Sequence, residues 1–231
     1  MSVELPAGEF PLHPHHDPTY ERPVHSRYLD PVELIWLSTA RKLGLTVRRH
    51  PDVFAMTEGD GILHLGPRSS LDPDDSVLQM IFHEICHWIT NGLETAQSRD
   101  WGFELDGGLD PREHACQRLQ ASLASRYGLR DMLGATGDFR QYWERLPADP
   151  LEPLDDSEWE KEVLRCTHAA LNRANEAPFR APLHEALQAT AAIRAAIQPF
   201  LASYCTEDPA DRLPSLWATT EQKENHPSGN S

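Results

Sequence analysis

The sequence predicts an α+β protein. One helix and a small antiparallel sheet come first, two central helices follow, and an appended helical layer forms the C-terminal part. Three observations predict this arrangement. Asp-Pro pairs stand where helices are expected to begin. Three short extended segments lie close together before residue 67. After residue 157, apolar side chains recur every three or four positions, as on the buried face of a helix.

These elements divide the 231-residue chain into a core and three flanking parts. Domains typically hold about 100–200 residues, so one compact unit is expected. We predict an extended N-terminal segment at 1–29, a core at 30–146, a C-terminal helical region packed on that core at 147–217, and a disordered tail at 218–231.

The first helix and the sheet are predicted from local signals. Asp30-Pro31-Val32-Glu33 predicts a helix that runs to about Leu43, because Asp is a good N-cap and Pro suits the first helical position. Strands are predicted at Thr46–Arg49, Val53–Thr57 and Ile62–Gly66, with Gly59-Asp60-Gly61 as the hairpin turn between the last two.

The two central helices repeat the same start signature. Asp72-Pro73-Asp74-Asp75 leads into a helix that is expected to end at Asn91-Gly92, and its nearly continuous apolar surface predicts burial. A loop at 93–109 then precedes a helix from Asp110 to about Tyr127. A proline- and acid-rich connection follows at 147–156, and further helices are predicted at 157–175 and 181–204.

Composition excludes several classes of partner. The formal charge of −15 comes from 36 acids against 21 Lys plus Arg, so nucleic acid and anionic membrane are not expected to bind. The chain has neither a basic and apolar leader nor a run of about 18 apolar residues, which predicts a soluble cytoplasmic protein. Four scattered cysteines without a C-x-x-C pair are expected to be reduced thiols. Oligomeric state is left open.

The motif His83-Glu84-Ile85-Cys86-His87 predicts the chemistry. An α-helix has 3.6 residues per turn, so the two histidines project from one face, and Glu84 lies about 100° round from His83. Two imidazoles at this spacing suit a zinc ion, with the glutamate as general base. Metal binding would also offset the cost of burying two imidazoles and a carboxylate in an apolar helix.

A catalytic zinc ion takes three protein ligands and a water, so a third ligand must come from another element. Thr90 and Leu93 stand where the longer His-x-x-Gly-x-x-His pattern would place glycine and histidine. Glu113 is the main candidate, because it is the only carboxylate between Arg112 and Arg130. The other candidates are His114, Asp106, Glu104 and Glu94, and Cys86 is a further residue close to the predicted cavity.

A second interpretation of Glu113 is purely structural. A helix that begins Asp-Pro-x-Glu can use the glutamate to close a capping box on its own first turn. The pattern of Asp, Pro, any residue and an acid also occurs at 30–33, 72–75, 149–152 and 208–211, where no metal is implied. Both interpretations stay open at the level of sequence.

The motif and its surroundings resemble the gluzincin class of zincin metallopeptidases, in particular the compact ImmA/IrrE-type enzymes. Glu113, Cys116 and Leu119, followed by Ala121, fit the spacing of that family's second motif, and Glu113 follows His87 by 26 residues. The resemblance covers roughly residues 30–130. It implies a zincin-like core, zinc ligands at His83, His87 and Glu113, and peptide-bond hydrolysis.

The predicted reaction uses a zinc-activated water with Glu84 as general base on a peptide or protein substrate. An extended substrate is expected to pair with the strand at 62–65. Two rival functions remain: a zinc-binding regulator of the same fold with restricted or no proteolysis, and a structural protein whose motif is coincidental. The candidates for an oxyanion stabiliser are Tyr127, His114, Tyr142, His168 and His184.

Overall fold

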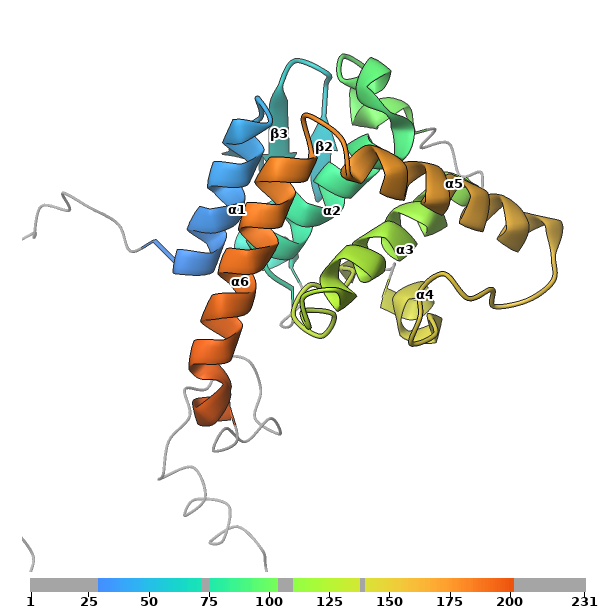
Figure 1. Cartoon of the computed structure of the whole chain (residues 1–231). Helices are drawn as coiled ribbons and strands as arrows, with labels where there is room; N and C mark the ends of the chain where they lie inside the picture. The colour runs from blue at the N-terminus through green and yellow to red at the C-terminus, as the bar shows by residue number, and fades with distance from the viewer. Residues whose placement is uncertain (1–28, 72–74, 104–109, 138–139, 202–231) are drawn as a thin grey trace, which may run out of the picture.

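The computed structural model describes residues 29–71, 75–103, 110–137 and 140–201 (Figure 1). These residues form six α-helices and a three-stranded sheet, which confirms the α+β class. The elements are α1 (Pro31–Lys42), β1 (Thr46–Arg49), β2 (Ala55–Thr57), β3 (Ile62–Leu65), α2 (Val77–Asn91), α3 (Pro111–Ser125), α4 (Arg140–Arg145), α5 (Glu158–Ala174) and α6 (Arg180–Leu201). Short 3-10 helices η1 (Arg68–Ser70), η2 (Leu93–Thr95) and η3 (Arg99–Gly102) lie in the connections.

The Asp-Pro signature marks the start of α1 and of α3. Asp30 Oδ1 accepts hydrogen bonds from the backbone N–H groups of Val32 at 2.9 Å and Glu33 at 3.0 Å. Asp110 Oδ1 accepts one from Arg112 N at 2.9 Å. The start of α2 was predicted too early, because its N-cap is Ser76, whose hydroxyl accepts from Gln79 N. Residues 72–74 of the predicted start lie outside the described residues.

The sheet is mixed, so the prediction of an antiparallel sheet is wrong in part. β2 and β3 form the predicted antiparallel hairpin, but β1 pairs in parallel with β3, and the strand order is β1-β3-β2. The burial of the strands explains this order. Leu63 and Leu65 of β3 are fully buried, whereas β1 is mostly exposed, so the apolar strand takes the central place and the charged strand an edge.

This order also overturns the prediction that the strand at 62–65 offers a free edge to a substrate. Because β3 is paired on both sides, β1 and β2 are the edge strands. On β2, the N–H group of Thr57 donates a hydrogen bond of 3.2 Å to Asp100 Oδ1 from η3. The loop that follows α2 therefore covers part of the β2 edge.

Helix α2 lies at the centre of the fold, as its apolar sequence predicts. It packs against α1, α3 and α5 (Figure 1). Its fully buried residues include Ile81, Phe82 and Ile85. The helix ends at Asn91, and its C-cap Gly92 has a φ of 103°, a conformation that glycine adopts without strain. The histidine motif is thus held on a helix that is fixed from several sides.

The C-terminal helices α5 and α6 share one hydrophobic core with the N-terminal elements. Leu171 and Leu183 belong to the same buried cluster as Trp36 of α1 and Ile85 of α2. Arg173 of α5 reaches the C-terminal end of α2, where its guanidinium donates to the carbonyl oxygens of Ile89, at 2.7 Å, and Thr90. The domain boundary at 146 stays a prediction.

A buried ion pair joins α3 to α5. Arg118 is fully buried and pairs with Glu160, and its guanidinium also donates to the Tyr142 hydroxyl at 2.7 Å and to the Pro150 carbonyl. Tyr142 belongs to α4, a short helix that was not predicted from the sequence. Within the described residues, no helix combines the length and the apolar character that a bilayer crossing requires.

Candidate metal centre

The two histidines of α2 converge on a common point. His83 and His87 lie one helical turn apart, and their Nε2 atoms are 2.7 Å from each other. The first turn of α3 packs beside them and brings in Glu113. Its Oε1 lies 3.6 Å from His83 Nε2 and its Oε2 lies 3.3 Å from His87 Nε2. Two imidazole nitrogens and a carboxylate therefore meet at the place where the sequence predicts a metal ion.

The side chain of Glu113 is turned toward the histidines and not toward its own helix cap. Among the described residues, no hydrogen bond joins its carboxylate to the Asp110 backbone, and Asp110 itself accepts from Arg112. Glu113 Oε1 is buried, and within the part of the chain that the structure describes it has no hydrogen-bond partner. A buried carboxylate oxygen without a donor is costly unless a cation or another donor satisfies it.

The orientation of the His83 ring is fixed by Gln120 of α3. The Gln120 side-chain NH₂ donates to the carbonyl oxygens of Leu133, at 2.9 Å, and Gly134, at 3.0 Å. Its Oε1 therefore faces His83 Nδ1 at 2.9 Å and accepts a hydrogen bond from it. With the proton on Nδ1, Nε2 carries the lone pair that a metal needs.

Burial and neighbouring charges shift the pKa values of His83, His87 and Glu113. Burial lowers the pKa of His83, and the nearby His87 lowers it further. Burial alone would lower the pKa of His87, but the Glu113 carboxylate outweighs it and raises the pKa to about 9. Burial alone would raise the pKa of Glu113, yet His87 brings it down to about 2. Without a metal, an ionised His87–Glu113 pair thus lies beside a neutral His83.

Glu84 lies next to the cluster and is held by a tryptophan. It is buried, with 8% of its surface exposed, and its Oε2 accepts a hydrogen bond of 3.3 Å from Trp101 Nε1. The Trp101 indole stacks on Trp88 with ring centroids 5.1 Å apart. Asp100 and Trp101 have φ values of 45° and 57°, a strained conformation for residues other than glycine. Strain of this kind is found where a loop must deliver a side chain to a defined place.

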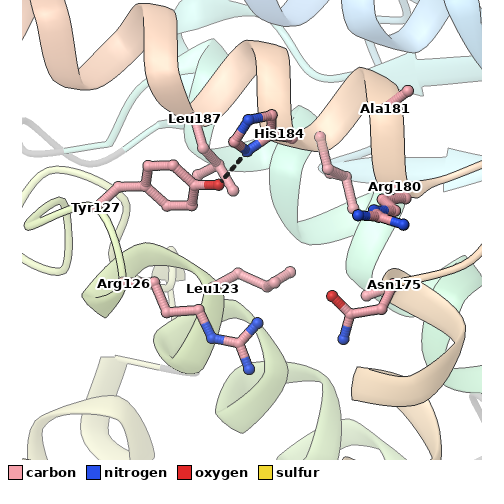
Figure 2. Close-up of a pocket in the computed structure, with 10 residues that line it drawn as sticks. Leu123, Arg126, Tyr127, Asn175, Arg180, Ala181, His184 and Leu187 are labelled. Atoms are coloured by element: carbon pink, nitrogen blue, oxygen red, sulfur yellow. Dashed lines mark hydrogen bonds between the residues drawn. The ribbon is translucent and has the colours of Figure 1, made fainter.

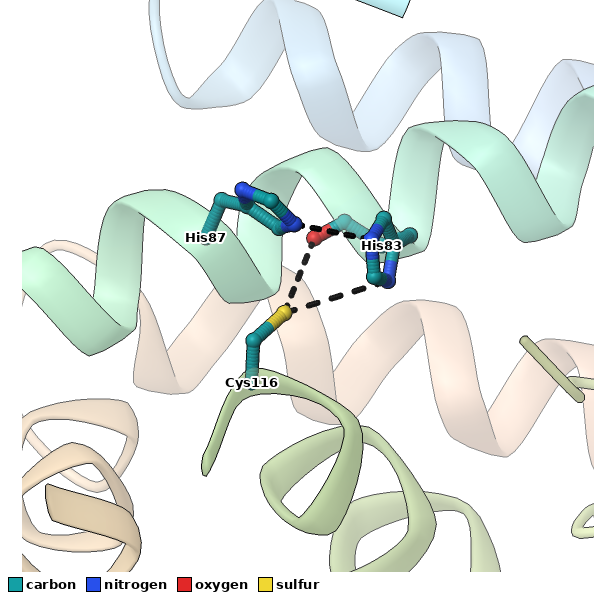
Figure 3. A group of neighbouring side chains, drawn as sticks. All are labelled: His83, His87 and Cys116. Carbon is teal, nitrogen blue, oxygen red and sulfur yellow. Dashed lines mark hydrogen bonds between the residues drawn. The ribbon is translucent and has the colours of Figure 1, made fainter. Parts of the chain in front are cut away.

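Cys116, one turn after Glu113 on α3, is a further residue with metal-ligand chemistry (Figure 3). Its Sγ lies 3.8 Å from His83 Nδ1 and 3.7 Å from the His83 carbonyl oxygen. The two ring nitrogens of an imidazole point in divergent directions, so the thiol faces the side of His83 that Gln120 occupies. Burial raises the pKa of the Cys116 thiol. Glu113 faces both Nε2 atoms and is the better third ligand by position.

The other candidate ligands are placed elsewhere or fall outside the described residues. His114 points away from the histidine pair, stacks on Tyr142 with centroids 3.8 Å apart, and accepts a hydrogen bond from Trp159 Nε1. Glu94 is exposed in η2 and Cys86 is enclosed in the hydrophobic core. Glu104 and Asp106 lie outside the described residues.

The proposed oxyanion stabilisers are likewise engaged elsewhere. Tyr127, in the turn after α3, and His184 of α6 form a hydrogen bond of 2.5 Å with each other. Tyr142 stacks on His114, and His168 is exposed on α5. Cys86, Cys116 and Cys166 are free thiols, and Cys205 lies outside the described residues.

Sequence reasoning missed four residues around the cluster: Gln120, Trp101, Cys116 as a neighbour of His83, and Phe103, whose ring centroid lies 4.3 Å from that of His87. Gln120 left a signal, because it follows Glu113 by seven residues and so lies on the same face of a helix. Trp101 and Phe103 belong to an irregular loop, where spacing carries no such information.

The donor set suits zinc. Zinc takes nitrogen and oxygen ligands at about 2.0–2.2 Å in a tetrahedron, which places neighbouring ligand atoms about 3.3–3.6 Å apart. The distances of 3.3 and 3.6 Å from the Glu113 oxygens to the Nε2 atoms match this spacing, and the 2.7 Å between the two Nε2 atoms is shorter.

Comparison of the chain with protein-family models, with curated proteins and with solved structures gave no match.

Proposed function

We propose that the protein is a cytoplasmic zinc metallopeptidase in which His83, His87 and Glu113 hold the metal ion and Glu84 is the general base. The observation that carries this proposal is the meeting of two histidine Nε2 atoms with a buried carboxylate oxygen that has no hydrogen-bond donor among the described residues. We further infer that α1, the sheet, α2 and α3 form a zincin-like core. The His-Glu-x-x-His motif and the position of Glu113 support that inference.

The chemistry follows from the donor set. When bound, zinc supplies a Lewis acid that lowers the pKa of a water molecule to near 7 and polarises a carbonyl group. Glu84 takes a proton from the attacking water and passes it to the leaving amine. Trp101 holds the Glu84 carboxylate in place, and Gln120 holds His83 in the tautomer whose Nε2 lone pair is free for a metal.

Substrate access on this proposal involves the outer edge of β2. A peptide added as a further strand would pair there, and it would have to displace Asp100 from the N–H group of Thr57. The proposed substrate is a peptide or protein segment in extended conformation.

The decisive experiment combines metal content with turnover. Purified protein should contain one zinc ion per chain by atomic emission and should cleave members of a peptide library, detected by mass spectrometry. Glu84→Gln should keep the zinc and abolish cleavage. Glu113→Ala should weaken zinc binding more than Cys116→Ala does. Protein without stoichiometric zinc, or a Glu84→Gln variant that still cleaves, would refute the proposal.

One observation favours a second candidate function, a zinc-binding regulatory or interaction protein with restricted or no proteolysis. Glu84 is buried and already accepts a hydrogen bond from Trp101, so its carboxylate is not fully available as a base. On this alternative, the wild type and Glu84→Gln would both bind zinc tightly and neither would cleave any peptide in the library.

A further inference from the structure

A cavity of about 410 Å³ lies away from the histidine cluster, between the C-terminal ends of α3 and α5 and the beginning of α6 (Figure 2). Cavities of this size accommodate small organic molecules. Its lining comes from three helices, and from the residues that follow α3 and α5. The shared core fixes the packing of these helices. The lining residues are Leu123, Arg126, Tyr127, Ala174, Asn175, Arg180, Ala181, Leu183, His184 and Leu187.

The inner part of the cavity is apolar. Leu123, Leu183 and Leu187 are buried residues of α3 and α6, with 5%, 3% and 1% of their surfaces exposed. All three belong to the main hydrophobic core, so this wall is rigid and does not depend on a ligand for its shape. An aliphatic or aromatic group placed against it would be removed from water on that side.

The outer part is positively charged. Arg126 follows the last residue of α3, and Arg180 is the first residue of α6. Within the described part of the chain, neither guanidinium has an ion-pair or hydrogen-bond partner, and none of the lining residues is acidic. Some other arginines do have such partners, for example Arg165 with Glu162 and Arg194 with Asp131. In a chain of net charge −15, two unpaired arginines around an acid-free cavity are a local reversal of charge.

Polar groups complete the rim. The Tyr127 hydroxyl and His184 Nδ1 lie 2.5 Å apart, and Figure 2 shows this pair on one side of the cavity, with Asn175 and Arg180 on the other. A hydroxyl, an imidazole and an amide are polar groups that orient a ligand, and guanidinium groups select a negative charge.

We propose that this cavity binds a small organic carboxylate, with the carboxylate at Arg126 and Arg180 and an apolar body against Leu123, Leu183 and Leu187. Arginine recognises carboxylates through paired N–H groups. An apolar wall next to two cations fits a molecule with one negatively charged end and one apolar end. The inference does not depend on the metal centre, because none of the proposed zinc ligands lines this cavity.

The test uses the 231-residue chain as purified, ¹⁵N-labelled, with 3-phenylpropionate as the probe. We expect saturable shifts of backbone amide resonances at the C-terminal end of α3 and the first turns of α6, with one site and an affinity of about millimolar, as ligand-efficiency limits suggest for so small a molecule. Neutral 3-phenylpropionamide, which has nearly the same shape, and acetate, which lacks the apolar body, should each bind at least about tenfold more weakly.

Variants provide the second arm. Arg126→Gln and Arg180→Gln should each weaken 3-phenylpropionate binding by about tenfold or more, because each removes a charge-assisted hydrogen bond. Arg165→Gln removes the same charge from an exposed position on α5 and should leave binding unchanged. The proposal is overturned if the probe gives no saturable shifts up to about 20 mM, if the amide binds as well as the carboxylate, or if Arg165→Gln weakens binding equally. Zinc content should stay constant throughout, which separates this test from that of the metal centre.

Discussion

Replacement of Gln120 by leucine should weaken zinc binding although Gln120 is not a proposed ligand. In the wild type, Gln120 Oε1 accepts from His83 Nδ1 at 2.9 Å and so leaves His83 Nε2 unprotonated. Leucine cannot accept this bond, so the proton can move to Nε2, where it competes with the metal. Partners that orient a metal-ligating histidine are worth about 10–100-fold in affinity, which corresponds to about 1.4–2.7 kcal/mol.

The same substitution should also destabilise the metal-free protein. The Gln120 amide donates to the carbonyl oxygens of Leu133 and Gly134, and both residues are buried. Each carbonyl left without a donor costs about 1–3 kcal/mol, so a loss of about 2–6 kcal/mol is expected. Gln120→Glu separates the two effects, because a carboxylate still accepts from Nδ1 but cannot donate to the carbonyls. It should lose stability and keep zinc affinity.

Two measurements test this reasoning. Competition with a chelating zinc indicator gives the affinity, and urea denaturation of the metal-free protein gives the free energy of unfolding. Ser122→Ala is the matched control, since Ser122 is buried on the same helix and its hydroxyl bonds only the Arg118 carbonyl in the described structure. If Gln120→Leu binds zinc as tightly as the wild type, or if Ser122→Ala loses as much affinity, the tautomer argument is wrong.

Three further outcomes are expected. Arg118→Leu should lower the free energy of unfolding by about 3–5 kcal/mol in urea titrations, because Glu160 would remain as a buried unpaired charge. The double variant with Glu160→Leu should regain part of the loss, and no recovery would speak against the ion pair as the cause. Free zinc at about 1,000 times its dissociation constant should stabilise the metal-free protein by about 4 kcal/mol and raise its Tm by about 8–16 °C, and His83→Ala should abolish the shift. Trp101→Phe should keep zinc affinity but lose about 1.5–3 kcal/mol of stability with the hydrogen bond to Glu84, and a zinc loss as large as that of Glu113→Ala would contradict its assigned role.

Local sequence signals predicted most of the helices. The starts of α1 and α3 follow from Asp30-Pro31 and Asp110-Pro111, because capping depends on residues within one turn. The strand order did not follow from the sequence. Each strand was found, but the place of β1 beside β3 depends on which strand buries its side chains, and that is settled by packing against the helices.

Only part of the candidate site could be predicted from the sequence. The histidine pair follows from helical spacing alone, whereas the direction of the Glu113 side chain depends on how α3 packs on α2. The sequence favoured Glu113 as the ligand but left the helix cap open as an alternative, and the structure turns the carboxylate toward the histidines. The contact of Trp101 with Glu84 could not be predicted from the sequence, because it depends on a left-handed loop conformation that no local sequence pattern indicates.

The contact between Arg173 and the end of α2 bears on how the chain folds during synthesis. Arg173 is 84 residues beyond Ile89, so the last carbonyls of the histidine helix stay without this partner until most of the chain has left the ribosome. Contacts of such long sequence separation form late, because the intervening chain must first lose its freedom. Helices α2 and α3 would then emerge with their chemistry in place but incompletely anchored. We therefore expect the cluster of His83, His87 and Glu113 to become rigid only after α5 has docked.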